Sequence, residues 1–356
     1  MAKVVVVGGG PAGLLSALAL ARHDFEVVVL EAKELPIDKA CGEGIMPHGL
    51  ALLDRLGVKQ RIESYHPYQG ICYRAGQLKA EAPFLAGPGW GVRRLELSRA
   101  LGQAVAEEPR IELRQGQRVT GLRQAEGGVE VHLESGRLRA DWLVGADGLA
   151  SKVRAWSGLE GGQARRQRWG VRRHFGLAPW SDKVEVHLAQ SCEAYITPVA
   201  KELVGVAFLW EKELAVPGKD QLWPFFLGHF PALAERLEGA EQASSQRAVG
   251  PLARRVKSVL GSKVFLVGDA SGYLDALTGE GISLAAGQAL AVADCLAAGR
   301  PSDYPARHRR LSRAYKISTS LLLQVVRYPA LAERVVGFLS KRPGLFSHLL
   351  ELASGR

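Results

Sequence analysis

The apolar residues of the chain form short runs separated by helical segments, a pattern typical of alternating strands and helices. Residues 4–7 and 26–30 are two nearly continuous apolar runs, and an Ala- and Leu-rich segment at 14–22 lies between them. Residues 264–267 form another short run, which an Ala-rich stretch at 282–298 follows. Short runs rich in Val predict buried parallel strands, and the longer segments between them predict helices.

The middle of the chain alternates between apolar and polar residues, as antiparallel strands do. Residues 69–73 and 77–82 flank a turn and predict a hairpin, and residues 111–144 predict a three-stranded meander. Four further alternating runs predict strands of one antiparallel sheet, at residues 169–175, 184–188, 194–198 and 204–210. We expect helices with proline breaks at residues 220–237, interrupted by Pro231, and from Tyr304 onward, interrupted by Pro329 and Pro343.

The first apolar run ends in Gly8-Gly9-Gly10-Pro11-Ala12-Gly13, which has the spacing Gly-x-Gly-x-x-Gly. In this motif Gly8 allows a tight turn, Gly10 lets a pyrophosphate approach the backbone, and Gly13 lets the helix pack on the strand. The pyrophosphate binds at the N-terminal end of the helix, where N–H groups and the helix dipole attract an anion. Glu31 ends the second run and can accept both ribose hydroxyls of an adenosine. The motif predicts a bound dinucleotide and leaves open whether it is FAD or NAD.

Two other apolar runs also end in glycine and an acid. The first ends in Gly145-Ala146-Asp147-Gly148, and the second ends in Gly268-Asp269. Ligands of open α/β sheets bind beyond the carboxyl ends of the strands. We therefore expect these two loops to converge with the glycine motif on the same dinucleotide.

The order of the patterns predicts two intertwined domains. With 356 residues the chain is long enough for both, and residues 158–168, rich in Gly, Gln and Arg, indicate a crossing between them. We expect an α/β (α+β two-domain) fold with a Rossmann-like domain, an antiparallel substrate-binding sheet and a helical C-terminal tail. The predicted boundaries are residues 1–65, 92–165 and 250–300 for the first domain, 66–91 and 166–249 for the second, and 301–356 for the tail.

Composition and charge narrow the class of protein. Hydrophobic residues make up 47%, which supports a sizeable core. The four cysteines show no Cys-x-x-Cys spacing, so we predict no metal site, and the pattern fits a reducing cytoplasm. The net charge is +10, but no basic tract contains interleaved aromatic residues, so nucleic acid is not a predicted partner. We expect neither a signal peptide, because the first apolar run leads directly into the glycine motif, nor a membrane-spanning segment.

Taken together, the three motifs resemble those of flavoproteins of the para-hydroxybenzoate hydroxylase fold. Within that fold, the chain resembles the branch that holds geranylgeranyl reductases and related FAD-dependent monooxygenases, through to about residue 298. The resemblance implies that the dinucleotide is FAD and that its domain is an FAD-binding domain. It also implies which residues bind the pyrophosphate and the adenosine ribose: Gly8, Gly10 and Gly13 with their neighbours Pro11 and Ala12, and Glu31 with its neighbour Ala32.

Three further positions match residues that bind or support FAD in this family. Arg94 matches an Arg that contacts the flavin cofactor, with Arg93 as the fallback. Asp269 matches the acid that binds the ribityl chain. Asp147 and Arg154 match an Asp-Gly motif that is mainly architectural and lies near the cofactor.

The segment Leu274-Asp275-Ala276-Leu277-Thr278-Gly279-Glu280-Gly281-Ile282 resembles the loop at the flavin ring in the reductase branch, with Ala276 where proline is usual. The resemblance implies that Gly279, Gly281 and Ile282 present backbone N–H groups to the O2/N1 edge of the flavin. A helix N-terminus there would stabilise the anionic reduced ring. The alternative interpretation is an ordinary glycine cap.

Cys41, Glu43 and Tyr195 are the candidate catalytic residues. Cys41-Gly42-Glu43-Gly44 resembles a reductase segment in which a Cys-Gly pair lies against the flavin, whereas a lone cysteine is more commonly buried and inert. Tyr195 lies in a segment that resembles one facing the flavin from the substrate sheet. A tyrosine of the hydrophobic core is an equally good interpretation.

The resemblance implies an FAD-dependent oxidoreductase with NAD(P)H as reductant, bound without a Rossmann domain of its own. Our first hypothesis is a monooxygenase that hydroxylates a small apolar aromatic substrate, such as a phenol with an alkyl chain, through a flavin hydroperoxide. Ala276 and the lack of a ferredoxin-type Cys cluster favour it over geranylgeranyl-reductase-like reduction of prenyl C=C bonds. The second alternative is an electron-transfer flavoprotein dehydrogenase that passes electrons to a quinone or iron–sulfur partner. No Trp-x-Trp-x-Ile-Pro occurs, which disfavours halogenation.

The C-terminal tail carries apolar residues at helical spacing, with interleaved basic residues at Arg327, Arg334, Lys341 and Arg342. Amphipathic helices packed on the body are one interpretation. The other interpretation is that these helices form an apolar entrance to the active site, through which a lipidic substrate enters from a membrane surface. The second interpretation predicts a cytoplasmic protein that contacts a membrane peripherally through these helices.

Overall fold

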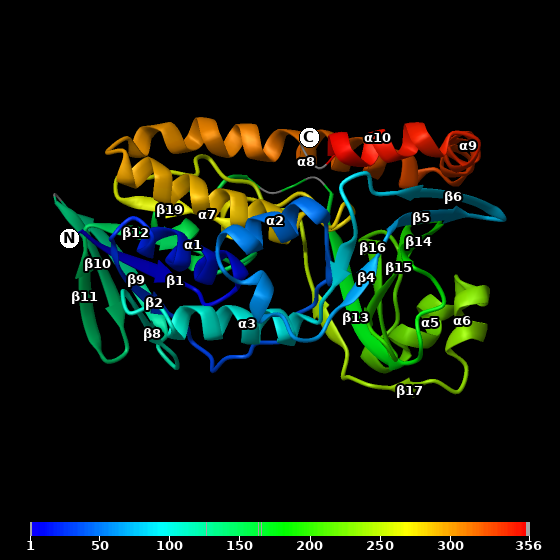
Figure 1. The fold of residues 1–356 in the computed structure, drawn as a ribbon, viewed down its shortest axis with the longest axis horizontal. Coiled ribbons are helices and arrows are strands. Elements are labelled where there is room, and N and C mark those ends of the chain that lie inside the picture. The colour runs from blue at the N-terminus through cyan, green and yellow to red at the C-terminus, as the bar shows by residue number, and fades with distance from the viewer. Residues whose placement is uncertain (1, 126, 163, 165, 354–356) are drawn as a thin grey trace.

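The computed structural model describes residues 2–125, 127–162, 164 and 166–353. A parallel sheet with its helices occupies one half of the molecule, a larger sheet occupies the other half, and C-terminal helices lie across both (Figure 1). The predicted crossing at 158–168 includes residues 163 and 165, and the predicted tail includes residues 354–356, all of which lie outside the described residues. The domain boundaries stay a prediction.

Five parallel strands form the first sheet, in the order β19-β12-β1-β2-β8. Val4 and Val6 of β1 pack on the helical face of this sheet, and Val5 and Val7 pack on the opposite face. Burial on both faces explains why these strands are continuous apolar runs in the sequence. The strands and the helices of the helical face are β1 (Lys3–Val7), β2 (Glu26–Leu30), β8 (Ile111–Arg114), β12 (Trp142–Gly145), β19 (Val264–Leu266), α1 (Pro11–Ala21), α2 (Pro47–Arg55), α3 (Arg94–Ala106) and α7 (Gly281–Ala297).

The prediction of a three-stranded meander over residues 111–144 is wrong at both ends. That stretch holds five strands, and the first and the last of them, β8 and β12, belong to the parallel sheet. Only the middle three form an antiparallel sheet, which covers the second face of the parallel one: β9 (Val119–Ala125), β10 (Gly128–Leu133) and β11 (Gly136–Ala140). Alternating apolar and polar residues indicate a strand with one buried face, but they do not indicate which strand pairs with it.

The larger sheet confirms the four predicted central strands and the predicted hairpin. Its order is β17-β13-β16-β15-β14-β5-β6, with β18 paired to β13. One pair departs from the expected antiparallel arrangement, since β14 and β5 are parallel. The two come from distant parts of the chain, so no tight turn imposes a direction on them. The strands are β5 (Gly70–Ala75), β6 (Leu78–Pro83), β13 (Arg168–Gly176), β14 (Lys183–Ala189), β15 (Cys192–Ala200), β16 (Leu203–Glu211), β17 (Glu241–Gln242) and β18 (Arg247–Val249).

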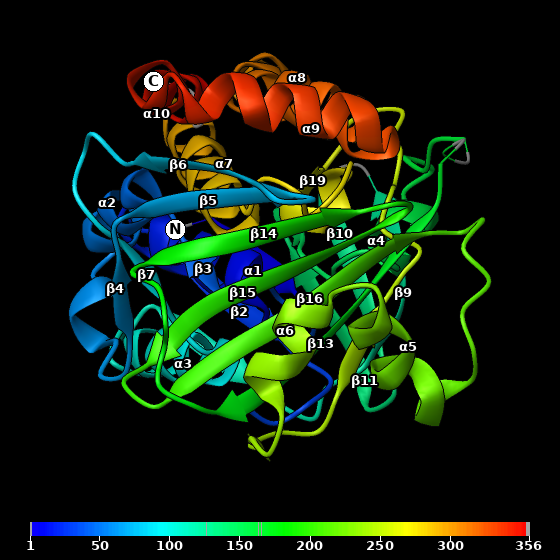
Figure 2. The same cartoon turned by 90° about the vertical axis from the view of Figure 1, so that its right-hand side faces the viewer.

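The two faces of the larger sheet have different surroundings. The helices α5 (Leu222–Gly228) and α6 (Pro231–Leu237) confirm the predicted break at Pro231 and cover one face of the sheet (Figure 2). Phe208 of β16 lies in the apolar cluster between them and the sheet. The opposite face is turned toward the parallel-sheet half and carries Arg172 and His174 of β13. The remaining short elements are β3 (Gly44–Ile45), β4 (His66–Tyr68), β7 (Gly89–Gly91), α4 (Lys152–Trp156), η1 (Lys59–Arg61), η2 (Lys219–Gln221), η3 (Gly268–Ser271) and η4 (Pro301–Asp303).

Three helices end the described chain: α8 (Tyr304–Arg327), α9 (Pro329–Ser340) and α10 (Pro343–Ala353). The predicted breaks at Pro329 and Pro343 are confirmed, because each proline starts a new helix. The helices form a layer over α7 and over the hairpin of β5 and β6 (Figures 1 and 2). Among the helices that the structure describes, none combines the length and apolar content needed to cross a bilayer.

Candidate cofactor and active site

The glycine motif forms the turn between β1 and α1. Gly8 has φ +109°, a backbone conformation that favours glycine. A Cβ at Gly13 would lie 1.8 Å from the Gly8 carbonyl oxygen, so only glycine lets α1 approach the strand end this closely. A Cβ at Gly10 would have open space around it, at the N-cap of α1 where N–H groups point outward. This geometry fits the predicted pyrophosphate site, with Pro11 and Ala12 in the first turn.

Glu31 lies directly after β2, beside the glycine turn. Its Oε2 accepts a hydrogen bond of 2.6 Å from the Gly9 N–H, and its Oε1 accepts one of 3.0 Å from the Lys33 N–H. Each carboxylate oxygen can accept a second hydrogen bond, so Glu31 keeps the capacity to bind ribose hydroxyls. Ala32 is exposed next to it.

The three strand-end loops converge, as the sequence predicts, because β19, β12 and β1 are neighbours in the sheet. Asp147 accepts hydrogen bonds from the Lys152 and Val153 N–H groups and from the Ser151 hydroxyl, and so holds the start of α4. Arg154 is buried and donates to the carbonyls of Leu149 (2.9 Å) and Ala270 (3.2 Å), tying the loop after β12 to the loop after β19. These contacts give Asp147 and Arg154 the architectural role that the resemblance implies.

Arg94, the first residue of α3, is 5% exposed. Its Nη1 atom is buried and has no hydrogen-bond partner in the described part of the chain. Burial lowers the pKa of the Arg94 guanidinium, and the nearby Cys41, Glu43, Asp38 and Asp269 oppose that shift. The fold thus brings four residues that are distant in the sequence around one buried cation with an unused donor.

Two of these neighbours are predicted site residues with shifted pKa values. Burial raises the pKa of the Asp269 carboxyl, against the attraction of Lys39 and Arg94. Burial and then the charge of Glu43 raise the pKa of the Cys41 thiol. The thiol therefore stays protonated at neutral pH, which makes it a poor nucleophile and leaves it able to donate a proton.

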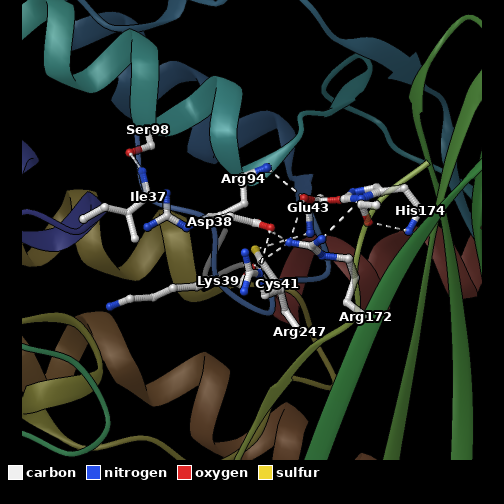
Figure 3. A network of polar contacts seen from close by, with 11 residues as sticks. Ile37, Asp38, Lys39, Cys41, Glu43, Arg94, Ser98, Arg172, His174 and Arg247 are labelled. Carbon is white, nitrogen blue, oxygen red and sulfur yellow. Dashed lines mark hydrogen bonds and ion pairs between the residues drawn. The ribbon is translucent and has the colours of Figure 1, made fainter. Parts of the chain in front are cut away.

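Glu43 is the centre of a buried polar network that joins the two halves of the molecule (Figure 3). Its Oε1 accepts a 2.8 Å hydrogen bond from the Arg94 N–H at the start of α3, and its Oε2 lies 2.6 Å from Nε2 of His174 on β13. Arg172 Nη1 lies 3.2 Å from Nδ1 of His174. Because a guanidinium only donates, Nδ1 accepts, and the proton on Nε2 is donated to Glu43.

The same network anchors the loop before Cys41. Arg172 contacts the Asp38 carboxylate and donates to the Lys39 carbonyl at 2.9 Å, and Arg247 Nε donates to Asp38 at 3.2 Å. Burial raises the pKa of Asp38, but the hydrogen bonds from the two arginines outweigh it and lower the pKa overall. Both oxygens of Glu43 are engaged, so these contacts give Glu43 a positioning role, and its part in catalysis stays a prediction.

The predicted flavin-ring loop precedes α7. The Gly279 N–H donates to the Ala276 carbonyl at 3.1 Å, so it is used within the loop and does not point outward as the resemblance implies. Gly281 and Ile282 lie in the first turn of α7, where helical N–H groups lack an intrahelical acceptor. The structure therefore leaves these two N–H groups for the predicted contact with the flavin.

Residues of β13 and α8 hold the predicted flavin-ring loop in place. Arg168 of β13 is buried, contacts Glu193 and lies 3.2 Å from Asp275 of the loop. The Tyr315 hydroxyl of α8 donates to the Asp275 carbonyl at 2.8 Å and accepts from the Asp275 N–H at 3.0 Å. Thr319 of α8 lies 3.3 Å from Thr278, hydroxyl to hydroxyl. The C-terminal helix α8 is therefore part of the predicted site.

Tyr195 contacts the same loop from β15. Its hydroxyl donates to the Leu277 carbonyl at 3.4 Å, and its ring packs with Leu277 and Leu323. Burial and the nearby Glu193 hold the pKa of Tyr195 well above its usual value. Tyr195 lies beside the predicted flavin-ring loop, and its catalytic role stays a prediction.

The sequence interpretation missed the buried charged residues on the inner face of the larger sheet. Arg168, Arg172 and His174 all come from β13, and Glu193 comes from β15. A partial signal was present. Along β13, Arg168, Arg172 and His174 lie an even number of positions apart, so they share one face of the strand, although Gly170 and Arg173 break the alternation of polar and apolar positions. Along β15, polar and apolar residues alternate from Cys192 to Thr197. A strand with a polar inner row is typical of a sheet that faces a site rather than a core.

A cavity of about 710 Å³ lies between η3, the start of α7 and the inner face of α8. Asp269 and Gly281 line it on the cofactor side, and Leu274, Arg168 and Leu323 line other walls. The glycine motif, Glu31 and Arg94 do not line it. The cavity therefore lies beside the predicted FAD groove and meets it at Asp269 and Gly281, and its volume is typical of a small-ligand site.

The residues present fit an FAD. The open Gly10 position and the acid at Glu31 lie directly after neighbouring strands of the parallel sheet, and the buried Nη1 of Arg94, at the start of α3, has no partner within the described chain. A buried cation with an unused donor is costly unless a ligand supplies an acceptor. Among the described residues, no cluster of metal-ligating side chains occurs.

Comparisons with solved structures support this fold. A flavoprotein/dehydrogenase from Cytophaga hutchinsonii aligns with a TM-score of 0.86 at 17% identity, over 99% of this chain and 92% of the other. The flavin-dependent brominase Bmp2 aligns with a TM-score of 0.87 at 19% identity, over 99% and 93%. At these identities the likeness shows the fold alone.

Curated relatives fall into two groups. Menaquinone reductase of Mycolicibacterium smegmatis is 27% identical over 335 residues, covering 85% of this chain and 78% of the relative. Para-nitrophenol 4-monooxygenase of a Pseudomonas species is 34% identical over 174 residues, covering 44% and 42%. The 3-demethoxyubiquinol 3-hydroxylase of Escherichia coli is 31% identical over 176 residues, covering 44% of each chain.

A family model described as an FAD binding domain matches residues 1–301. This range contains the glycine motif, Arg94, Asp269 and the start of α7. The resemblance to the geranylgeranyl reductase branch within this fold stays a prediction. With this match and the geometry of the strand-end loops, the chain belongs to the FAD-binding-domain family and is an FAD-dependent oxidoreductase.

Proposed function

We propose that this chain is an FAD-dependent monooxygenase that adds one oxygen atom of O2 to an apolar aromatic substrate, a phenol with an alkyl chain. The observation that carries the proposal is the cavity of about 710 Å³ against the loop that bears Asp269 and Gly281. Two relatives are named as hydroxylating or oxygenating enzymes for a phenol and a quinol. A substrate in this cavity would lie next to the flavin-ring loop.

Bound and reduced FAD would supply the electrons that activate O2. Glu31 would accept the ribose hydroxyls, and the first N–H groups of α1 would hold the pyrophosphate. Asp269 would accept a ribityl hydroxyl, and the N–H groups of Gly281 and Ile282 would favour negative charge on the reduced ring. We include NAD(P)H in the proposal as the reductant.

The cavity walls suit a ring with one polar end. Leu274 and Leu323 give an apolar wall. Arg168 also lines the cavity, and its buried Nε has no hydrogen-bond partner within the described chain. An unpaired buried donor favours a substrate oxygen in reach, because the donor is otherwise unsatisfied. The α8 helix packs against the loop through Tyr315 and Thr319.

A second candidate function is the reduction of a prenyl C=C bond. Two observations favour it: the menaquinone reductase relative matches 85% of this chain, and the protonated Cys41 thiol lies beside Arg94. Reduction of an alkene adds a hydride to one carbon and a proton to the other. Cys41 is the candidate donor of that proton.

The test uses FAD-loaded, photoreduced protein and the mass of the product. One sample receives an alkyl phenol and isotopically labelled O2, and the other receives a prenylated menaquinone under argon. The proposal predicts one labelled oxygen atom in the first product and no change in the second. Two added hydrogens in the second sample and none in the first would replace the proposal by the second candidate. Oxidation of the flavin without a change in either substrate would exclude both.

A further inference from the structure

The exposed large hydrophobic residues of the described chain are concentrated on the C-terminal helices. Eight of the thirteen lie on α8, α9 and α10, Tyr328 lies between α8 and α9, and Leu78 and Leu85 lie next to this layer. Leu78 reaches Gly337 of α9, and the Leu85 N–H donates to Glu351 of α10. Isolated exposed apolar residues are normal in monomers, whereas a concentration of this kind marks an interaction surface.

These residues form outward stripes at helical spacing, so the helices are apolar on two opposite faces. The outward stripe of α8 contains Ile317 and Leu321 and continues to Tyr328, directly after the helix, and these residues are 51%, 64% and 52% exposed. The buried side of α8 packs on the body through Leu323 and Val326. The other two helices repeat the pattern, with outward residues Leu331 and Phe338 on α9 and Leu345, Leu349 and Leu352 on α10.

The same layer concentrates positive charge. Residues 304–353 contain nine Lys or Arg and two Glu, a net charge of +7 out of +10 for the chain. Arg310, Arg334 and Lys341 are among the exposed basic residues. Two other arginines lie over exposed aromatic rings: Arg327 at 5.5 Å from the Tyr328 ring centre and Arg342 at 4.2 Å from that of Phe338.

We propose that the outer face of α8, α9 and α10 docks on an anionic membrane surface. Apolar side chains that enter the headgroup region and flanking basic side chains that contact anionic lipids are the features that hold a helix in the plane of a membrane. A second copy of the chain fits less well, because two helical layers with a net charge of +7 each would repel one another. This docking does not depend on which reaction the protein catalyses.

The cavity lies close to this face. Lys316, Ser320 and Gln324 of α8 line the cavity and are themselves exposed, and Leu321 of the outward stripe lies between two of them in sequence. Docking through α8 would therefore place the cavity entrance at the membrane surface. If the proposed function holds, a substrate with an alkyl or prenyl chain could enter from the bilayer without crossing water.

The test is sedimentation of FAD-loaded protein with vesicles of phosphatidylcholine alone or of phosphatidylcholine with phosphatidylglycerol. We expect binding to the anionic vesicles that weakens with added salt. A basic residue near an anionic surface contributes about fivefold to partitioning, so Arg310→Glu/Arg334→Glu/Lys341→Glu should lower binding about 100-fold or more. Leu321→Ser/Leu349→Ser should lower binding to the anionic vesicles in a salt-independent way.

Matched controls separate docking from general effects of charge and apolarity. Arg118→Glu/Lys201→Glu/Lys212→Glu changes three exposed basic residues outside the helical layer, and Trp156→Ser removes an exposed apolar residue on α4. Both controls should bind vesicles as the unchanged protein does. Equal loss in the charge control, or wild-type protein that stays in the supernatant with anionic vesicles, would overturn the proposal. So would dimerisation that Leu321→Ser/Leu349→Ser abolishes while vesicle binding is absent.

Discussion

Replacing Glu43 tests whether the network between the two halves of the molecule holds the cofactor site in place. Glu43 is 4% exposed and binds the Arg94 N–H at 2.8 Å and His174 Nε2 at 2.6 Å. Arg172 Nη2 also lies 3.7 Å from Glu43 Oε1. Glu43→Ala removes the acceptor of each hydrogen bond and takes away one of the two carboxylates that contact the Arg172 guanidinium. Glu43→Gln keeps one oxygen for Arg94 but places an amide donor against the N–H of His174.

The expected magnitudes follow from these contacts. Removing one partner of a buried charged network costs about 3–5 kcal/mol, so Glu43→Ala should lose that much of the free energy of unfolding. Glu43→Gln should lose about 1–3 kcal/mol, the cost of one unsatisfied buried polar contact. Glu43 has φ +61°, which glycine adopts more readily than alanine, so Glu43→Gly should be about 1 kcal/mol more stable than Glu43→Ala.

Urea unfolding of the FAD-free protein followed by circular dichroism measures these differences. Glu43→Ala should also weaken FAD binding, because the start of α3, which carries Arg94, loses the hydrogen bond that holds it. We expect a roughly tenfold loss of affinity, which corresponds to about 1.4 kcal/mol, and a fluorescence titration with FAD measures it. Glu202→Ala, at an exposed turn between β15 and β16, is the control and should change neither quantity. If Glu43→Ala unfolds at the same urea concentration as the unchanged protein, the network does not hold the two halves together.

Three further predictions concern the cofactor site and the buried charges. Gly13→Ala should destabilise the FAD-free protein by more than about 2 kcal/mol in urea unfolding, because the new Cβ would lie 1.8 Å from a carbonyl oxygen; unchanged stability would contradict the close approach of α1. Asp269→Ala should be purified with little FAD, and a fully loaded yellow variant would refute its assignment to the ribityl chain. Burial raises the pKa of Glu193 to about 7 from 4.5, despite the opposing charge of Arg168. Between these two pH values the Glu193 carboxyl is therefore protonated in the folded protein and ionised in the unfolded chain. The free energy of unfolding should fall by up to about 1.4 kcal/mol per unit as pH rises from 4.5 to 7, and Glu193→Gln should flatten that slope.

The sequence by itself determined the parts of the protein that depend on local patterns. The turn at Gly8–Gly13 and the acid at Glu31 follow from a spacing that only a tight strand-to-helix turn satisfies. The convergence of the Asp147 and Asp269 loops also follows, because parallel strands place their carboxyl ends along one edge. The proline breaks of the C-terminal helices are equally local, since proline lacks the N–H that would continue the helix.

Only the tertiary structure decided which distant residues meet. The sheet to which β8 and β12 belong, and the parallel pairing of β14 with β5, depend on partners far along the chain. The tertiary structure also decided that Glu43 meets His174 and that Arg168 meets Asp275, because each pair joins segments more than 100 residues apart. A sequence pattern indicates which side of a helix or strand is buried. The residues that this side contacts depend on how the two sheets and the C-terminal helices pack together.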